Sequence, residues 1–189
     1  MEFLEQIDRS LMLFLNGMHF PFFDFVFYYL SETIVGLPIY LLIIYFIIKR
    51  YGAKEGAIVI ALLIASVGLA DRISVVAFKD VFMRYRPCHN LEIRDQLHML
   101  SDYCGGKYGF VSSHASNVFA VAGFCFFALR QRKTFVIIVL VWAALVAYSR
   151  VYLAKHYPAD IFAGAILGFL VAWIVYKLYA AIRKKSCKL

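Results

Sequence analysis

Five apolar runs dominate the chain, and each is long enough, or nearly long enough, to cross a membrane as a helix. They cover about residues 34–48, 57–78, 116–129, 134–147 and 161–181. A perpendicular crossing needs roughly 20 apolar residues, so the shorter runs are expected to extend into their polar flanks. With 63% hydrophobic residues in 189, the composition exceeds what a soluble domain needs. The sequence predicts an all-α fold, a polytopic membrane helical bundle with five clear spans.

The first 33 residues are predicted to form two shorter helices. Residues 2–18 place apolar side chains at helical spacing and put Glu2, Glu5, Gln6, Asp8 and Arg9 on the other face. This pattern is typical of an amphipathic helix in the membrane interface. A short aromatic segment, residues 21–30, follows as a re-entrant helix or as part of one kinked crossing, which brings the total to about six core helices. We expect one domain, residues 1–189, with 1–20 as the interfacial helix and 34–181 as the transmembrane catalytic core.

The basic residues gather at the ends of apolar runs, which accounts for the formal net charge of +8 without a nucleic-acid partner. Three clusters fall on one side when the spans alternate: Lys49, Arg50 and Lys54; Arg130, Arg132 and Lys133; Arg183, Lys184, Lys185 and Lys188. By the positive-inside rule that side, with the C-terminus, is cytoplasmic. The loops at residues 79–113 and 150–160 are then expected on the outer side of the plasma (inner) membrane.

A polar segment between the last two apolar runs carries Ser149, Arg150, His156 and Asp160. An arginine can bind phosphate oxygens with two N–H groups, and a histidine can attack phosphorus or transfer a proton. A carboxylate four residues later can orient that histidine. The alternative is a charged loop at a helix start, because Pro158 and Asp160 also suit a first helical turn.

The second apolar run ends in three cations, Lys79, Arg84 and Arg86, followed by Pro87. Lys79 and Arg86 are about two helical turns apart, so we expect them on one side of the helix, where two cations can hold a phosphate. Single cations at a membrane boundary commonly anchor to lipid head groups. Three cations at an end that is not expected to be cytoplasmic make that alternative weaker.

The third apolar run is preceded by Gly-Phe-Val-Ser-Ser-His-Ala-Ser-Asn at residues 109–117. Ser112 or Ser113 is expected to cap the helix, whose first turn then offers backbone N–H groups to an anion. His114 in that turn is placed to act as a general acid beside a bound phosphate. A plain serine cap with an incidental interfacial histidine is the structural alternative.

Taken together, the three segments resemble the signature of the type-2 phosphatidic acid phosphatase superfamily, which includes membrane lipid phosphatases and vanadium haloperoxidases. The matching motifs are Lys79-x6-Arg86-Pro87, Ser112-Ser113-His114 and Ser149-Arg150-x5-His156-x3-Asp160. The first and third match without gaps. The middle one departs, because Val111 and Ser113 stand where the family usually has proline and glycine. The motifs cover residues 79–160, and the span pattern extends the resemblance to the C-terminus.

The resemblance implies a role for each matched residue. His156 would be the nucleophile that forms a phosphohistidine, Asp160 would orient it, and His114 would protonate the leaving group and then help to activate water. Phosphate binding would fall to Lys79, Arg86, Ser112, Ser113 and Arg150, with adjacent backbone N–H groups. Family members work without a divalent metal, so the resemblance implies neither a metal nor another cofactor.

The implied activity is hydrolysis of a membrane lipid phosphate or diphosphate at the non-cytoplasmic face. Undecaprenyl diphosphate is the favoured substrate, followed by phosphatidylglycerophosphate, lipid A 1-phosphate and phosphatidate. A lipid phosphotransferase is the alternative among enzymes, and a lipid transporter or flippase is the alternative outside them. A haloperoxidase does not suit so apolar a chain. The oligomeric state is left open.

Some features outside the motifs leave alternatives open. Cys88 and Cys104 flank the largest polar loop and are equally compatible with a disulfide or two free thiols. That loop either contacts the head group or covers the site, and His89 and His98 within it receive no catalytic role. Asp71 lies inside the second span, where it could hold Lys79 or pair with another residue.

Overall fold

The computed structural model describes residues 2–101 and 103–186, and in these residues it contains helices and no strand. The only β-type pairing there is an isolated bridge between Tyr85 and Tyr108. The predicted all-α class is therefore confirmed. Cys187 and Lys188 of the basic tail lie outside the described residues.

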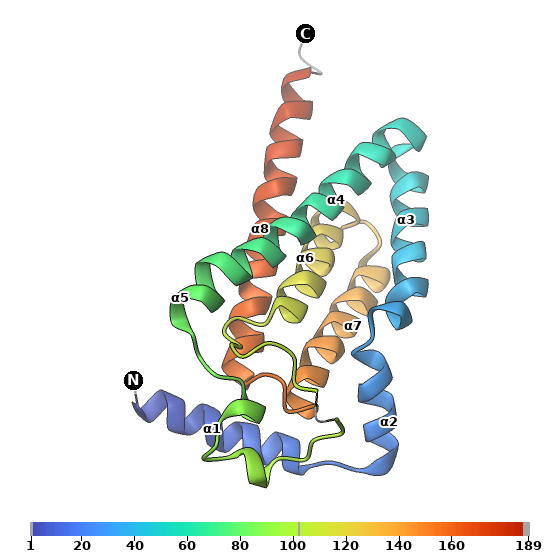
Figure 1. Cartoon of the computed structure of the whole chain (residues 1–189). Helices are drawn as coiled ribbons and strands as arrows, with labels where there is room; N and C mark the ends of the chain where they lie inside the picture. The colour runs from blue at the N-terminus through green and yellow to red at the C-terminus, as the bar shows by residue number, and fades with distance from the viewer. Residues whose placement is uncertain (1, 102, 187–189) are drawn as a thin grey trace.

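Five helices form the bundle and correspond to the five apolar runs: α3 (Leu37–Tyr51), α4 (Ala53–Ile73), α6 (Ser113–Ala128), α7 (Lys133–Tyr152) and α8 (Pro158–Ser186). They run alternately up and down, as Figure 1 shows. Most extend beyond the apolar runs into polar flanks, as expected. A 3-10 turn, Thr33–Gly36, lengthens α3, and a π-helical segment, Ser74–Lys79, with α5 (Asp80–Phe82) continues α4.

The helix α6 is the central element of the bundle and is too short to count as a full membrane span. Four helical segments are long and apolar enough to cross a membrane by themselves, whereas α6 has only 16 residues. Its neighbour α8 approaches it closely at Gly164, where an added Cβ would lie 2.6 Å from the carbonyl oxygen of Ser112. At Gly168 an added Cβ would overlap the carbonyl of Ser116. The two glycines, four residues apart, therefore allow the backbones of α6 and α8 to approach closely.

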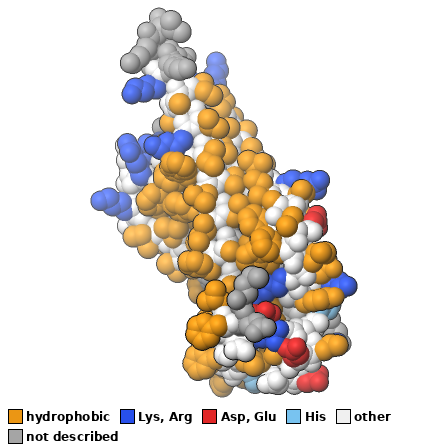
Figure 2. All heavy atoms as spheres, turned by 90° about the vertical axis from the view of Figure 1, so that its left-hand side faces the viewer, with side chains coloured by type: hydrophobic (Ala, Val, Ile, Leu, Met, Phe, Trp, Pro, Cys, Tyr) orange, Lys and Arg blue, Asp and Glu red, His pale blue; other side chains and the backbone are white. Residues whose placement is uncertain are grey.

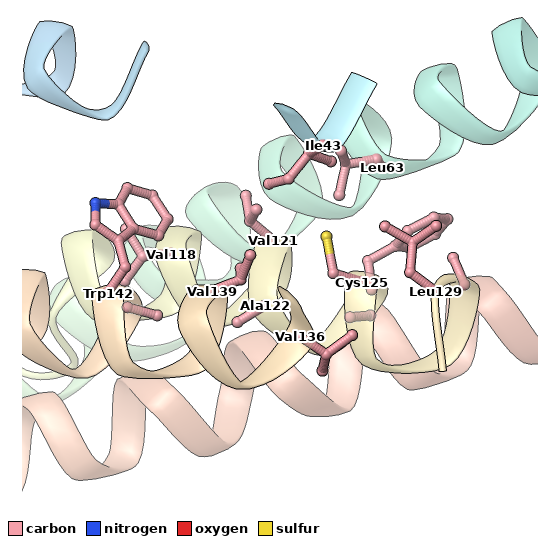
Figure 3. Packing of buried hydrophobic residues seen from close by; sticks show 14 of the residues in the cluster. Ile43, Leu63, Val118, Val121, Ala122, Cys125, Leu129, Val136, Val139 and Trp142 are labelled. Carbon is pink, nitrogen blue, oxygen red and sulfur yellow. The ribbon is translucent and has the colours of Figure 1, made fainter. Parts of the chain in front are cut away.

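The largest hydrophobic core lies between α6 and the helices around it. Figure 3 shows Val121 and Cys125 of α6 facing Ile43 and Leu63, which come from α3 and α4. Trp142 of α7 belongs to the same cluster. This packing fixes α6 relative to α4 and α7, so the ends of all three are held together at the lower end of the bundle in Figure 1.

The amphipathic helix α1 (Glu2–Gly17) lies across that lower end, and α2 (Pro21–Leu30) turns away from it by 114°. The sequence interpretation placed Asp8 on an outward polar face, and this is wrong. Asp8, Met12 and Asn16, four residues apart, form the buried face. Most of the apolar side chains, including Leu4 and Phe14, are exposed. Polar contacts and the packing of Met12 therefore hold α1 to the bundle, while most of its apolar side chains remain free to contact lipid.

The two ends of the molecule differ in charge. In Figure 2 a band of hydrophobic side chains crosses the middle of one face, with Lys and Arg above it and both signs of charge below. The turn between α3 and α4 and the end of α8 lie at the upper end in Figure 1, and each carries basic residues. The turn between α6 and α7 lies in the same part of the molecule, so the described residues of the three predicted basic clusters are opposite to the connection between α5 and α6.

The connection between α5 and α6, residues 83–112, folds over the lower end of the bundle. A disulfide joins Cys88 and Cys104, whose Cα atoms are 6.3 Å apart, so the pairing that the sequence left open is formed. The middle part of the connection packs on α2 and on the link between α1 and α2. The His98 ring stacks on His19 of that link, and His98 Nε2 lies 3.0 Å from Asp24 Oδ1 of α2. These contacts give His98 a structural role in the cover of the site.

Candidate active site

The three motifs meet at the lower end of the bundle, where α4 ends, α6 begins, and α7 passes into α8 (Figure 1). Arg86, Arg150, His156 and Asp160 are all buried there although all are polar or charged. Burial of ionisable groups is costly unless they pair with each other or with a ligand. Their common burial therefore identifies this point as the candidate site.

The first motif is not one continuous helix face, and this corrects the expected geometry. The helix ends at Phe82, and Met83 takes a left-handed conformation with φ of 46° that turns the chain back over the bundle. Lys79 stays on the helix and donates to Ser113 Oγ at 2.6 Å. Arg86 lies in the connection and reaches the site from the other side.

Arg86 contacts the candidate nucleophile directly. Its Nη1 lies 3.2 Å from His156 Nε2 and 3.4 Å from the carbonyl oxygen of Lys155, and its Nε has no hydrogen-bond partner among the described residues. Gly109 makes room for this arrangement: an added Cβ would lie 3.2 Å from Arg86 Cγ and 3.1 Å from Asp160 Oδ2. A side chain at this position would crowd both groups.

The second motif forms the N-terminus of α6. Ser112 is the N-cap, as predicted, and its Oγ accepts from the Ala115 N–H at 3.4 Å, while its own N–H donates to the Asp160 carbonyl. Ser113 is the first helical residue, so the replacement of the family's glycine needs no positive φ. Its hydroxyl contacts both Lys79 and Ser74. His114 is exposed and lines a cavity of about 220 Å³ with Glu32 and Asn117.

The third motif is a tight connection built around the carbonyl of Arg150. That oxygen accepts from the N–H groups of Lys155 and His156, and Ala154 takes a positive φ of 55° to close the turn. The turn brings His156 back beside the arginine that precedes it by six residues. The Arg150 side chain is buried, and its Nε has no hydrogen-bond partner in residues 2–101 and 103–186.

His156 and Asp160 face each other across one turn at the start of α8. His156 Nδ1 lies 3.5 Å from Asp160 Oδ2, and both side chains are almost completely buried. Nδ1 faces the carboxylate, although it has no hydrogen-bond partner in residues 2–101 and 103–186, and Nε2 faces Arg86, so Nε2 is the nitrogen directed at the cations. Asp160 also accepts from the Tyr157 N–H and from Arg84.

Burial and positive neighbours keep His156 neutral. The pKa of its imidazole falls well below the ordinary 6.5, first because the ring is buried and then because Arg86, Arg150 and Lys79 repel a proton. A neutral imidazole has a free lone pair, which a nucleophile needs. The same cations would attract a phosphate dianion to this ring.

Two contributors were missed or left unassigned at the level of sequence. Arg84 donates to Asp160 Oδ1 at 2.9 Å, although the motif comparison passes over it. Asp8 Oδ2 accepts a hydrogen bond from Arg84 Nη2 at 2.7 Å, although Asp8 lies near the start of the chain. The three neighbouring cations were a visible signal for Arg84, whereas no local pattern marks Asp8.

The partner of Asp71, which the sequence left open, is Asn117. Asp71 Oδ1 accepts a hydrogen bond from the Asn117 side chain at 3.0 Å.

Among the described residues, one group could suggest a metal centre: Cys88, His89 and Cys104 have donor atoms within 4.8 Å of one another. The two sulfurs form the disulfide, so only His89 remains as a ligand. One imidazole does not make a metal site. His89 therefore keeps no assigned chemical role.

Comparisons with known proteins identify the family of the chain. A family model described as the PAP2 superfamily matches residues 55–184. A protein of Porphyromonas gingivalis named lipid A 4'-phosphatase is 32% identical over 185 residues, covering 98% of this chain and 78% of the relative. A Bacteroides thetaiotaomicron protein of the same name is 34% identical over 176 residues, covering 93% and 78%.

Two solved structures share the fold. One is the first transmembrane PAP2-type phosphatidylglycerolphosphate phosphatase from Bacillus subtilis, with a TM-score of 0.72, 22% identity, and coverage of 96% of this chain and 89% of that one. The other is LpxE from Aquifex aeolicus, with a TM-score of 0.67, 25% identity, and coverage of 89% and 93%. The chain thus belongs to the PAP2 superfamily and is an integral membrane lipid phosphatase, a phosphoric monoester hydrolase.

Proposed function

We propose that the protein hydrolyses a phosphate monoester on the sugar of a lipid, with the 4'-phosphate of lipid A as the first candidate. The reaction would proceed through a phosphohistidine at His156. The observation that carries the reaction is the convergence of Arg86, Arg150 and Lys79 on one buried, neutral imidazole. The substrate class rests on the two relatives named lipid A 4'-phosphatase, which are similar along almost the whole chain. Undecaprenyl diphosphate, favoured from the sequence alone, becomes a comparison substrate.

In the proposed first step, His156 Nε2 attacks phosphorus while Asp160 holds the proton on Nδ1. The N–P bond forms as the bond from phosphorus to the leaving oxygen breaks, and His114 gives its proton to that oxygen. Lys79, Arg86 and Arg150 neutralise the charge on the phosphoryl oxygens. Water then attacks the phosphohistidine with His114 as the base, and inorganic phosphate leaves.

The serines are proposed to act through position more than through their hydroxyl groups. Ser113 Oγ already holds Lys79, and Ser112 Oγ already caps α6. The groups left for phosphate in the first turn of α6 are the backbone N–H groups of Ser113 and His114. A helix N-terminus suits a phosphate because its free N–H groups point along the axis.

Two spaces beside the site suit a lipid with a large polar head group. A cavity of about 940 Å³ is lined by Arg84, Tyr85, Lys107 and Tyr157. An apolar groove of about 660 Å³ lies beneath α1 and is lined by side chains such as Ile7, Leu11 and Phe162. A sugar in the first and acyl chains in the second would lie next to the site, because neither space is lined by His114 or His156.

Phosphate release from purified protein in detergent with EDTA tests the reaction, and a lipid panel tests the substrate. We expect lipid A to lose its 4'-phosphate, as located by mass spectrometry, faster than phosphatidate, phosphatidylglycerophosphate or undecaprenyl diphosphate react. A preference for the 1-phosphate or for the diphosphate would contradict the substrate assignment. Transfer of labelled phosphate to a lipid acceptor, without release, would identify a phosphotransferase.

The orientation is proposed from charge and from the disulfide. Basic residues lie opposite the site, and a disulfide near the site suits an oxidising compartment. In an otherwise cysteine-free background, a membrane-impermeant thiol reagent should label Leu91→Cys, at an exposed position near the site, in intact cells. Gln131→Cys, at the turn between α6 and α7, should react only after permeabilisation. The opposite pattern would reverse the orientation.

A further inference from the structure

We propose that Asp8, on the surface helix α1, is a positioning residue for the His156–Asp160 pair and acts on it through Arg84. The inference rests on the proposed function, because it concerns the same nucleophile. Asp8 is nine-tenths buried, whereas Glu5, one turn earlier on the same helix, is exposed. A buried carboxylate on a helix that otherwise lies at the surface needs partners, and its partners lead to the site.

Hydrogen bonds run from α1 to Asp160, the carboxylate that faces the nucleophile. Asp8 Oδ2 accepts from Arg84 Nη2 at 2.7 Å, and Arg84 Nη1 donates to Asp160 Oδ1 at 2.9 Å. The other oxygen of Asp160, Oδ2, lies 3.5 Å from His156 Nδ1. Arg84 also lies over the Tyr157 ring at 4.1 Å, which fixes the plane of its guanidinium. One planar cation therefore joins two carboxylates in a fixed geometry.

Asp8 also completes the start of the helix that carries Asp160. Asp160 accepts from the Tyr157 N–H at 3.0 Å, which is the backward half of a capping box. The forward half needs a side-chain oxygen at the N-cap, and Tyr157 has none in reach of the first turn. Asp8 Oδ1 supplies an acceptor from α1 instead, at 2.9 Å from the Ala159 N–H. One oxygen of Asp8 therefore contacts Arg84, which holds Asp160, and the other contacts the first turn of α8.

The charge balance gives Asp8 an effect on reactivity as well as on position. Asp8, Arg84 and Asp160 together carry a formal charge of −1, which opposes the positive charge that His156 gains as it attacks phosphorus. Without the Asp8 charge, this group is neutral, and Arg84 withdraws more of the Asp160 charge from the imidazole. The nucleophile would then face Arg86, Arg150 and Lys79 with less compensation.

The way in which α1 packs on the bundle places Asp8 next to Arg84. The buried face contains Asp8 and Asn16, and Asn16 bonds the carbonyl oxygens of Tyr152 and His98. Leu4 and Phe14 on the other side are exposed. Arg9 pairs with Glu92, and Met12 packs in a buried cluster with Tyr157, so α1 is held by polar and apolar contacts, and Asp8 provides the contact to Arg84. A helix in the membrane interface becomes a structural part of the reaction centre.

The test is Asp8→Asn, which keeps an oxygen for the Ala159 N–H and removes the charge that faces Arg84. We expect kcat to fall on the order of tenfold, as for other residues that orient a reacting group, with KM nearly unchanged. The pKa of His156 should fall further, so the acid limb of kcat/KM should move to lower pH. The other charged groups around His156 are unchanged in this variant: Asp160, Arg150, Lys79, Arg86 and His114.

Glu55→Gln is the matched control. Glu55 also joins an arginine and a hydroxyl, Arg183 and Tyr179, each at 2.8 Å, but at the far end of the bundle. It should leave kcat and the pH profile unchanged. A double-mutant cycle adds Arg84→Gln: Asp8→Asn should cost little more once Arg84 is gone, because both act through one contact.

The inference is overturned if Asp8→Asn lowers thermal stability but leaves kcat and the pH profile as in the wild type, or if the two variants are additive. A ¹⁵N titration of the His156 ring in ligand-free protein decides the point independently of turnover: the midpoint should be lower in Asp8→Asn, and an equal midpoint refutes the link. A wild-type protein that releases no phosphate from any lipid would refute the proposed function, and the titration would still judge Asp8.

Discussion

The two ends of the bundle both carry clusters of charge, and they hold those charges in different ways. At the end opposite the site, side chains such as Lys49, Arg130 and Arg183 lie at the surface. At the site end, Arg86 and Arg150 are buried against His156. Exposed cations interact weakly because water screens them, whereas buried ones act strongly on whatever lies between them. Burial, more than the number of charges, distinguishes the catalytic end.

The largest expected effect comes from removing the nucleophile. His156→Ala should lower phosphate release from lipid A by at least about a thousandfold, since an essential nucleophile has no substitute in the site. Glu55→Gln at the opposite end should behave as wild type. The measurement is inorganic phosphate released per minute at saturating lipid. Equal activity of His156→Ala and wild type would remove the distinction between the two ends.

His114→Ala should cost about 10²- to 10⁴-fold with a lipid substrate, because the leaving sugar oxygen needs a proton. The loss should be much smaller with p-nitrophenyl phosphate, whose leaving group is stable as an anion. The ratio of the two losses is the measurement. An equal loss on both substrates would show that His114 does not act as the general acid.

Exchanging single arginines compares the two ends most directly. Arg86→Ala should lower kcat/KM about 10²- to 10³-fold, the usual cost of removing one preorganised transition-state donor. Arg183→Ala removes an arginine that is about half exposed and paired with Glu55, and should change kcat/KM less than twofold. Similar losses in the two variants would mean that total positive charge, and not the buried site, drives the reaction.

A pair of glycines tests the geometry within the site end. Gly109→Ala places a methyl 3.1 Å from Asp160 Oδ2 and 3.5 Å from His156 Nδ1, so we expect kcat to fall on the order of tenfold. Gly106→Ala, in the same connection, meets no atom within 4 Å and should be silent. Both are compared by kcat and by melting temperature. Equal kcat in the two variants would show that the His156–Asp160 contact tolerates displacement.

The smallest effect is a shift along the pH axis. Because burial and three cations lower the pKa of His156, the ring should remain neutral below pH 6.5 in ligand-free protein. Protonation, and with it loss of the nucleophile, should begin only as the pH falls further. A ¹⁵N titration, with the signal assigned by its absence in His156→Ala, measures this. A midpoint at or above 6.5 would contradict the account of a buried, cation-facing ring.

Apolar periodicity predicted the five bundle helices and their alternation, because burial in lipid imposes a pattern that is local in sequence. The spacing of His156 and Asp160 likewise predicted their contact across one turn. The path of the chain after Phe82 was not predicted, because a single left-handed residue, Met83, turns Arg86 away from the helix. Asp8 was misplaced for a related reason: its partner Arg84 is 76 positions away, and only tertiary packing brings them together.

The most direct test of the central claim is to trap the covalent intermediate. Protein mixed with ³²P-labelled lipid A is quenched within milliseconds in alkali, which preserves phosphohistidine, and the labelled peptide is sequenced. We expect acid-labile phosphate on His156, lost when unlabelled lipid is added before the quench and absent in His156→Ala. Label on any other residue, or turnover in His156→Ala at the wild-type rate, would contradict it.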